Sequence, residues 1–224
     1  MQQTDKGVER MNFKVRPARP DDASFLAWVM LTAGRSHLER GIWDIIIGRP
    51  ESECLTFIEH LAVTAEPHML HYSIFIVAEV DERPVAALSG YDPETLGEET
   101  VATHWPVVME KMGLTDEDMA SEQQGVAAYL TCHPEPHEGA WIVESVATLP
   151  EYRGRGLIGD LLKEILDKGK REGFRRAQVS FLIGNTPAKR AYQKAGFRIH
   201  DEKRHPDFEA VFGCPGTARM LREL

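Results

Sequence analysis

Two stretches in the last third of the chain decide the fold: RGRGLIG at residues 153–159 and NTPAKRAYQKAGF at residues 185–197. The first lies between a predicted strand at residues 141–148 and a predicted amphipathic helix at residues 157–170. Glycines in such a loop let backbone N–H groups point at a ligand, and the helix start adds partial positive charge. The loop therefore predicts a pyrophosphate site, to which Arg153 and Arg155 add donors. The alternative is a glycine-rich turn with two solvated arginines.

The spacing Gly154-x-Gly156-x-x-Gly159 also matches the dinucleotide-binding fingerprint, so a nucleotide-dependent oxidoreductase is a competing interpretation. That fingerprint should start at the strand end, whereas residues 149–153 intervene here. It should also be followed about 20 positions later by an acidic residue, but residues 178–181 read QVSF. The motif lies late in the chain, with little room for further βαβ units. These observations disfavour the oxidoreductase.

The two stretches together resemble the signature of the GNAT superfamily of acyl-CoA-dependent N-acetyltransferases. The family's Arg/Gln-x-x-Gly-x-Gly/Ala pattern falls on Arg153, Gly156 and position 158, which is Ile158 here. The second stretch matches through Asn185 and Tyr192, and the resemblance covers residues 141–201. It implies a GNAT-like α/β fold: a mixed, mostly antiparallel central sheet flanked by helices.

The resemblance also implies the site that binds acetyl-CoA. The backbone N–H of Val146 would stabilise the tetrahedral intermediate, and Ala147 and Thr148 would pair with the pantetheine arm like an added strand. Ile158 departs from the family's small residue, so its side chain must point into the core. The residues expected to contact the cofactor are Val146, Ala147, Thr148, Arg153, Gly154, Arg155, Gly156, Leu157, Ile158, Gly159, Asn185 and Tyr192.

Direct attack of an amine on a thioester needs a base, since a lysine-like ammonium has a pKa near ~10.4, and an acid for the leaving thiolate. Glu144, on the strand beside the expected thioester, is the candidate base; its alternative role is to pair with a basic neighbour. Tyr192 is the candidate acid, because a phenol can donate a proton; its alternative role is packing. The predicted reaction is transfer of an acetyl group from acetyl-CoA to a primary amine in a ternary complex. A non-catalytic acyl-CoA-binding or sensory module of the same fold is the alternative function.

The acidity of the protein is concentrated in one segment. The net charge is −9, which argues against a basic surface for nucleic acid, whereas residues 92–138 alone carry eleven acidic residues and one lysine. This segment, an insertion before the cofactor-binding strand, therefore has a net charge of −10 and leaves +1 for the rest. We expect it to favour a cationic acceptor, unless the charges only solvate a surface excursion.

The remaining features describe the expected domain. Residues 12–224 are predicted to form one domain and residues 1–11 a flexible extension. Three separated cysteines and a polar N-terminus favour a reducing, cytoplasmic location, and no apolar run approaches the ~20 residues of a membrane helix. No metal site is expected, since the Cys132–His137 loop has no second ligand cluster. The sequence leaves a homodimer open and does not name the amine. A helix is expected after an N-cap at Asp21 or Asp22, with Phe25, Leu26, Val29 and Met30 on one face. Further strands are expected at 13–18, 73–80, 85–91, 177–183, 197–201 and 217–224, and further helices at 55–63 and 187–195.

Overall fold

A seven-stranded sheet with the order β1-β2-β3-β4-β5-β7-β6 organises the molecule. The computed structural model describes residues 12–119 and 123–224, so the expected extension at residues 1–11 lies outside the described residues. All neighbouring strands are antiparallel except β4 and β5. This confirms the mixed, mostly antiparallel sheet and is not the parallel sheet of a dinucleotide-binding enzyme. The strands are β1 (Lys14–Pro17), β2 (Phe75–Val80), β3 (Arg83–Tyr91), β4 (Ala140–Thr148), β5 (Arg176–Leu182), β6 (Arg198–Arg204) and β7 (Gly216–Glu223).

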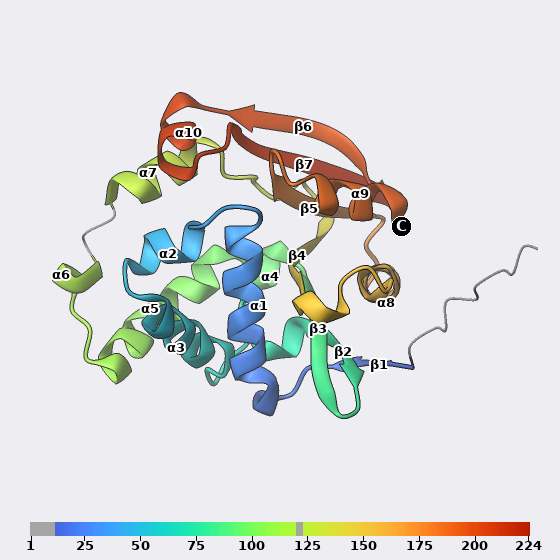
Figure 1. Cartoon of the computed structure of the whole chain (residues 1–224), viewed down its shortest axis with the longest axis horizontal. Coiled ribbons are helices and arrows are strands. Elements are labelled where there is room, and N and C mark those ends of the chain that lie inside the picture. The colour runs from blue at the N-terminus through green and yellow to red at the C-terminus, as the bar shows by residue number, and fades with distance from the viewer. Residues whose placement is uncertain (1–11, 120–122) are drawn as a thin grey trace, which may run out of the picture.

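Helices cover both faces of this sheet, and the strands divide into two groups (Figure 1). The strands β1 to β3 form one end of the sheet and β5 to β7 the other, with β4 between them. The helices are α1 (Ala23–Arg35), α2 (Ile42–Ile47), α3 (Glu51–Ala62), α4 (Pro93–Leu96), α5 (Glu98–Met112), α6 (Asp116–Met119), α7 (Gln123–Thr131), α8 (Leu157–Arg171), α9 (Thr186–Lys194) and α10 (Pro206–Phe212).

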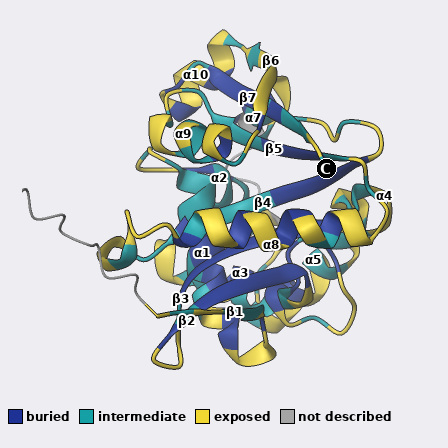
Figure 2. Ribbon diagram, turned by 90° about the vertical axis from the view of Figure 1, so that its right-hand side faces the viewer, coloured by how far each residue is buried: buried dark blue, intermediate teal, exposed yellow. Residues whose placement is uncertain are grey.

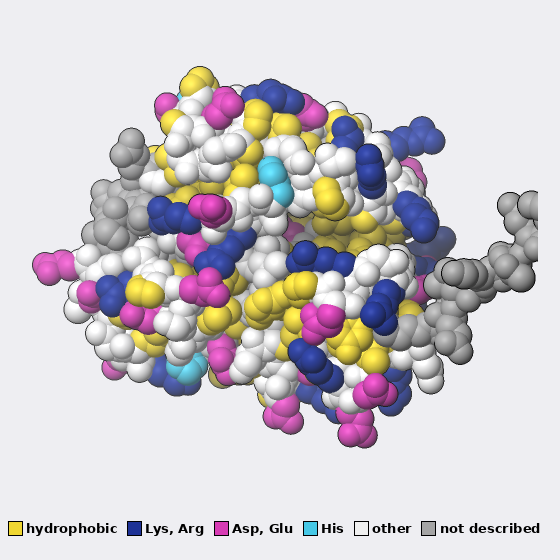
Figure 3. Space-filling model, viewed as in Figure 1, with side chains coloured by type: hydrophobic (Ala, Val, Ile, Leu, Met, Phe, Trp, Pro, Cys, Tyr) yellow, Lys and Arg dark blue, Asp and Glu magenta, His cyan; other side chains and the backbone are white. Residues whose placement is uncertain are grey.

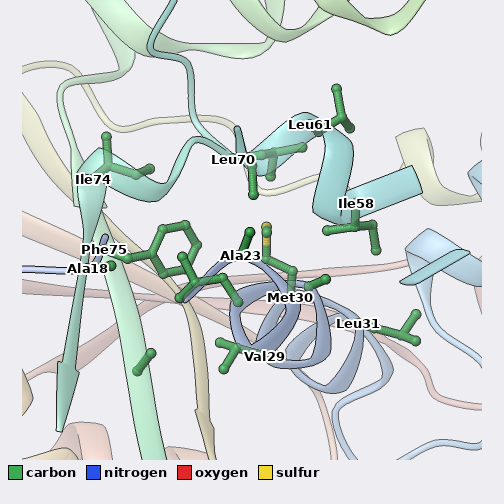
Figure 4. Close-up of a cluster of buried hydrophobic side chains, with 14 of the residues drawn as sticks. Ala18, Ala23, Val29, Met30, Leu31, Ile58, Leu61, Leu70, Ile74 and Phe75 are labelled. Carbon is green, nitrogen blue, oxygen red and sulfur yellow. The ribbon is translucent and has the colours of Figure 1, made fainter. Parts of the chain in front are cut away.

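The first core cluster lies between α1, α3 and one face of the sheet. Met30 and Val29 of α1 are fully buried, and they lie among residues of α3 and β2 such as Ile58 and Phe75 (Figure 4). Ile142 of β4 belongs to the same cluster. This face of the sheet is therefore the α1 face.

The second core cluster fills the opposite face, beneath α8. Leucines and isoleucines of α8 recur every three or four residues, and Leu161, Leu162 and Ile165 are fully buried. In Figure 2 this helix crosses the sheet and turns its exposed residues outward. Val143 of β4 packs here, whereas its neighbour Ile142 faces α1. This second face is the α8 face.

The acidic insertion is helical in the part that the structure describes. It leaves β3 after Tyr91, forms α4 to α7 and returns into β4. The helix α5 packs on α3, and α7 packs on α2 and α10. The insertion therefore lies on the α1 side of the sheet. No helix of the described residues is long and apolar enough to cross a membrane.

Candidate active site

The sheet opens between β4 and β5. These strands pair only from Ala140↔Arg176 to Val143↔Val179, although β4 continues to Thr148 and β5 to Leu182. Beyond Val143 no described strand pairs with the β5 side of β4, so backbone groups along that edge are available to a ligand. On this side the molecular surface is hollowed between the β5–β7 part and α8, and hydrophobic side chains line the hollow (Figure 3). The opening is the geometric centre of the candidate site.

A bulge in β4 lies at this opening. Ser89 pairs with Glu144 and Ala87 with Ala147, so β4 uses three residues where β3 uses two. Ser145 adopts a φ of 51°, which accommodates the extra residue. Val146, the predicted oxyanion donor, follows directly and packs with the second core cluster, on the α8 face.

Glu144 lies on the α1 face of β4, because Ser89 opposite it and Ile142 two residues before it face that way. The Tyr91 hydroxyl donates a hydrogen bond of 3.0 Å to Glu144 Oε2. In the part of the chain that the structure describes, no Lys or Arg pairs with this carboxylate, so the alternative of a basic neighbour is not what the structure shows. Burial raises the pKa of Glu144 to about 7, the Tyr91 hydrogen bond opposes this rise, and the negative charge of Glu98 adds to it.

The predicted pyrophosphate loop, residues 153–159, leads into the first turn of α8. Gly154 and Gly156 have φ values of 76° and 86°, which favour glycine, and a Cβ at either would meet nothing within 4 Å. Among the described residues, no backbone carbonyl accepts from the N–H groups of these glycines, Leu157 or Ile158. The α8 N-terminus thus presents free donors and its positive dipole end to open space. Gly159 also borders open space.

The side chains around this loop fit an anionic ligand. Arg153 and Arg155 are exposed, and they donate to the backbone carbonyls of Thr148 and Glu151 at 3.2 and 3.1 Å, respectively. The Arg155 guanidinium also lies over the Tyr152 ring. The Ile158 side chain packs against the second core cluster, as its departure from the family pattern required. The Ile158 side chain therefore leaves the space beside Gly154 and Gly156 open.

Tyr192 approaches the opening from the α8 face. Its ring is 6% exposed and lies near Phe181 and Phe197. Burial, followed by the negative charge of Glu144, raises the pKa of its phenol above the ordinary value. Among the described residues, no hydrogen-bond partner of the Tyr192 hydroxyl is found.

Asn185 has a local structural role in addition to its predicted contact with CoA. Its Oδ1 accepts a 3.0 Å hydrogen bond from the Ala188 N–H and caps α9, and its Nδ2 donates to Ser36 Oγ at 2.6 Å. This fixes α9, and with it Tyr192, against the loop that follows α1.

Several polar residues of the site were not predicted from the sequence. The Tyr129 hydroxyl lies 3.0 Å from His133 Nδ1, and His133 Nε2 lies 3.1 Å from Glu98 Oε1. Burial raises the pKa of Tyr129, and the charges of Glu144 and Glu98 raise it further. All three residues belong to the insertion: Tyr129 lies in α7, His133 follows α7, and Glu98 begins α5. His133 belongs to the loop considered above for metal binding, and the described residues contain no group of ligands suited to a metal ion.

Comparison with known proteins agrees with this geometry. Residues 105–197 match the acetyltransferase (GNAT) family. This range includes the glycine-rich loop at residues 153–159 and the stretch with Asn185 and Tyr192. No curated protein sequence matches the chain. One acetyltransferase crystal structure is similar over 94% of this chain and 98% of its own, with a TM-score of 0.68 and 19% identity. An N-acetyltransferase from Staphylococcus aureus Mu50 is similar over 93% and 100%, with a TM-score of 0.68 and 20% identity.

A third similar structure holds the expected donor. The yncA protein from Salmonella typhimurium, solved with its cofactor acetyl-CoA, is similar over 95% of this chain and 94% of its own, with a TM-score of 0.51 and 14% identity. Identities this low show a shared fold, and the family match adds the sequence motifs. Residues 105–197 are thus similar to the acetyltransferase (GNAT) family, and nearly the whole chain shares the fold of the solved acetyltransferases.

Proposed function

We propose that this protein transfers the acetyl group of acetyl-CoA to a primary amine by direct attack in a ternary complex. The match of residues 105–197 to the acetyltransferase (GNAT) family supports acyl-CoA-dependent acetyl transfer in general. The observation that carries the proposal is Glu144 at the opening of the sheet. It is a carboxylate without a basic partner among the described residues, and it has a pKa of about 7. A carboxyl group in this state suits proton abstraction near neutral pH.

The donor side of the site is supported by unfilled hydrogen-bonding capacity. We assign the pyrophosphate to the loop of Gly154, Gly156 and the first residues of α8, with Arg153 and Arg155 beside it. The pantetheine arm is assigned to the unpaired edge of β4 at Ala147 and Thr148. The Thr148 Oγ1 atom is buried without a partner in the described structure, which fits a polar ligand at this edge. When bound there, acetyl-CoA supplies an activated acetyl thioester.

Glu144 acts as the base in this proposal. An incoming alkylammonium loses a proton to the carboxylate before its nitrogen can attack, because the protonated amine has no free electron pair. The hydrogen bond from Tyr91 holds one carboxylate oxygen and leaves the other, Oε1, free to accept that proton.

Val146 and Tyr192 act on the other side of the reacting carbon. The Val146 N–H, just after the bulge, is assigned to the oxygen that gains negative charge. The raised pKa of Tyr192 keeps its phenol protonated at neutral pH, so the hydroxyl can give its proton to the departing sulfur. The base and the acid thus approach from opposite faces of the sheet.

We further propose that the acceptor is cationic. The helical insertion lies on the α1 side, the same side as Glu144, and its net charge is −10. Its potential attracts cations and repels anions toward that face. Steering of this kind weakens as salt shortens the Debye length to ~8 Å at physiological ionic strength. The kcat/KM for a cationic amine should therefore fall as salt rises, while that for a neutral amine stays nearly constant.

A screen of primary amines with acetyl-CoA tests the proposed function, using release of the free CoA thiol as the readout. Glu144→Gln should lower kcat/KM by roughly 10²-fold or more and abolish its dependence on pH near 7. Acetyl-CoA binding, measured by calorimetry, should be retained in this variant. Binding of acetyl-CoA by the wild type with no thiol release for any amine would instead support the non-catalytic acyl-CoA-binding module.

A further inference from the structure

The insertion brings three polar side chains together on the side of the sheet that also carries the candidate base. Glu98 begins α5, Tyr129 lies near the end of α7, and His133 follows α7 in the loop toward β4. Contacts of 3.0 and 3.1 Å link the Tyr129 hydroxyl, the His133 ring and the Glu98 carboxylate. We call these three residues the insertion triad. It joins the first and the last parts of the insertion on the α1 side of β4.

The insertion triad and Glu144 share one electrostatic environment. The charge of Glu98 raises the pKa of Glu144, and the charges of both carboxylates raise the pKa of Tyr91 and Tyr129 beyond the effect of burial. Like charges repel each other. In the described part of the chain, no Lys or Arg pairs with Glu98 or Glu144. A cation from outside would relieve this repulsion.

Two buried hydroxyls on the same face of the sheet as Glu144 also have no partner among the described residues. Ser89 Oγ is fully buried and belongs to the residue directly opposite Glu144 on β3. Ser180 Oγ is likewise buried, on β5 one position beyond the last pair with β4, Val143↔Val179. Both residues lie on the α1 face, as alternation along their strands requires. Buried hydroxyls usually find a partner, so this pair indicates a polar ligand or water next to Glu144.

This inference rests on the proposed function. We propose that the acceptor is a diamine. Its reacting nitrogen lies at Glu144 and Ser180, and its second ammonium group binds Glu98. The Glu98 side chain is 66% exposed, so the second ammonium group can reach it from solvent. His133 contacts Oε1 of Glu98 and thereby fixes the carboxylate. The Tyr129 ring beside it adds an aromatic surface that attracts cations. Glu98 is therefore the residue that selects the acceptor.

The test compares kcat/KM for 1,4-diaminobutane and for 1-aminobutane in three proteins: wild type, Glu98→Gln and Glu99→Gln. Glu99 is the matched control, since it is the next residue of α5 and carries the same charge. The assay is run at pH 9, because Glu98→Gln also lowers the pKa of Glu144, and at pH 9 Glu144 is ionised in every variant. The wild type should prefer the diamine. Glu98→Gln should lower the ratio of diamine to monoamine kcat/KM roughly tenfold, and Glu99→Gln should leave it unchanged.

The outcomes separate this inference from the proposed function. Equal kcat/KM for both amines in the wild type, or equal ratios in Glu98→Gln and wild type, would leave acetyl transfer standing and overturn the diamine site. If neither amine releases thiol, the proposed function fails for these amines, and calorimetry with 1,4-diaminobutane decides the inference. Binding that weakens in Glu98→Gln but not in Glu99→Gln would support the site, and absence of binding to the wild type would overturn it.

Discussion

Replacing Tyr91 by Phe removes one hydrogen bond from the candidate base and leaves the ring in place. The Tyr91 hydroxyl donates to Glu144 Oε2 at 3.0 Å and thereby stabilises the ionised carboxylate. A hydrogen bond to a charged group contributes about 1.5–3 kcal/mol. Since 1.36 kcal/mol corresponds to about one pKa unit, its loss should raise the pKa of Glu144 by roughly one to two units. The carboxylate fraction at pH 7 then falls roughly five- to fiftyfold.

The measurement is kcat/KM for the best amine as a function of pH. It is expressed per neutral amine, so that ionisation of the substrate does not contribute. In the wild type, this quantity should rise through an apparent pKa near 7, the value expected for free Glu144. In Tyr91→Phe the midpoint should move upward, and at sufficiently high pH the activity should return to nearly the wild-type level.

Tyr72→Phe serves as the control, because Tyr72 is a partly buried tyrosine that packs against His71 on the same side of the sheet. It should leave the midpoint near 7. Thermal melting of each variant shows whether the fold is retained, since Tyr91 is only 4% exposed. A Tyr91→Phe protein that is slower by the same factor at every pH would refute the reasoning, as would an unshifted midpoint.

Three further predictions concern the donor site, the acid and the fold. The double variant Arg153→Glu, Arg155→Glu should weaken acetyl-CoA binding at least tenfold by calorimetry, because two charge-assisted contacts to phosphate become repulsive; unchanged affinity would place the pyrophosphate elsewhere. Tyr192→Phe should lower kcat roughly 10²-fold at neutral pH with little change in acetyl-CoA affinity, and unchanged kcat in a chemistry-limited assay would assign Tyr192 to packing. Burial, with the charges of His104 and His71, lowers the pKa of His68 from 6.5 to about 4. The contribution of neutral His68 to the free energy of unfolding is therefore fully present above pH 6.5 and declines as pH falls toward 4. About 2 kcal/mol should be lost by pH 5, and urea titrations should show a smaller loss in His68→Asn.

The part of the fold that follows residue 140 was predictable because its local signals agree. The helix expected at residues 157–170 is α8, Leu157–Arg171, where apolar residues recur at helical spacing and Gly173 follows. The helices α2, α10 and those of the insertion were not predicted. The helix α5 contains Pro106 and begins with two glutamates, and its amphipathic pattern is weak, so packing on α3 decides its conformation more than local propensity does.

The site was predictable only where it lies within one motif. Glu144 and Tyr192 stand beside the two stretches that carry the family resemblance. Tyr91, in contrast, is 53 positions from Glu144 and meets it only through the pairing of β3 with β4. The insertion triad depends on two helices that return to the same place. The one available signal was the excess of acidic residues between 92 and 138, which indicated a cationic acceptor without indicating which carboxylate would bind it.

In the proposed reaction, the bulge at Ser145 lets one strand contact both substrates. Before the bulge, alternation places Ile142 and Glu144 on the α1 face and Val143 on the α8 face. In a regular strand Val146 would share the face of Glu144. The extra residue reverses the alternation, so Val146 packs on the α8 face and Ala147 on the α1 face. Consequently the base remains on the side of the acidic insertion, while the next positions of β4 turn toward the side of the α8 loop and Tyr192. Loss of this single irregularity would turn the Val146 side chain to the α1 face and its N–H, the proposed oxyanion donor, to the other edge of β4, which makes the geometry of Ser145 a requirement of the proposed reaction.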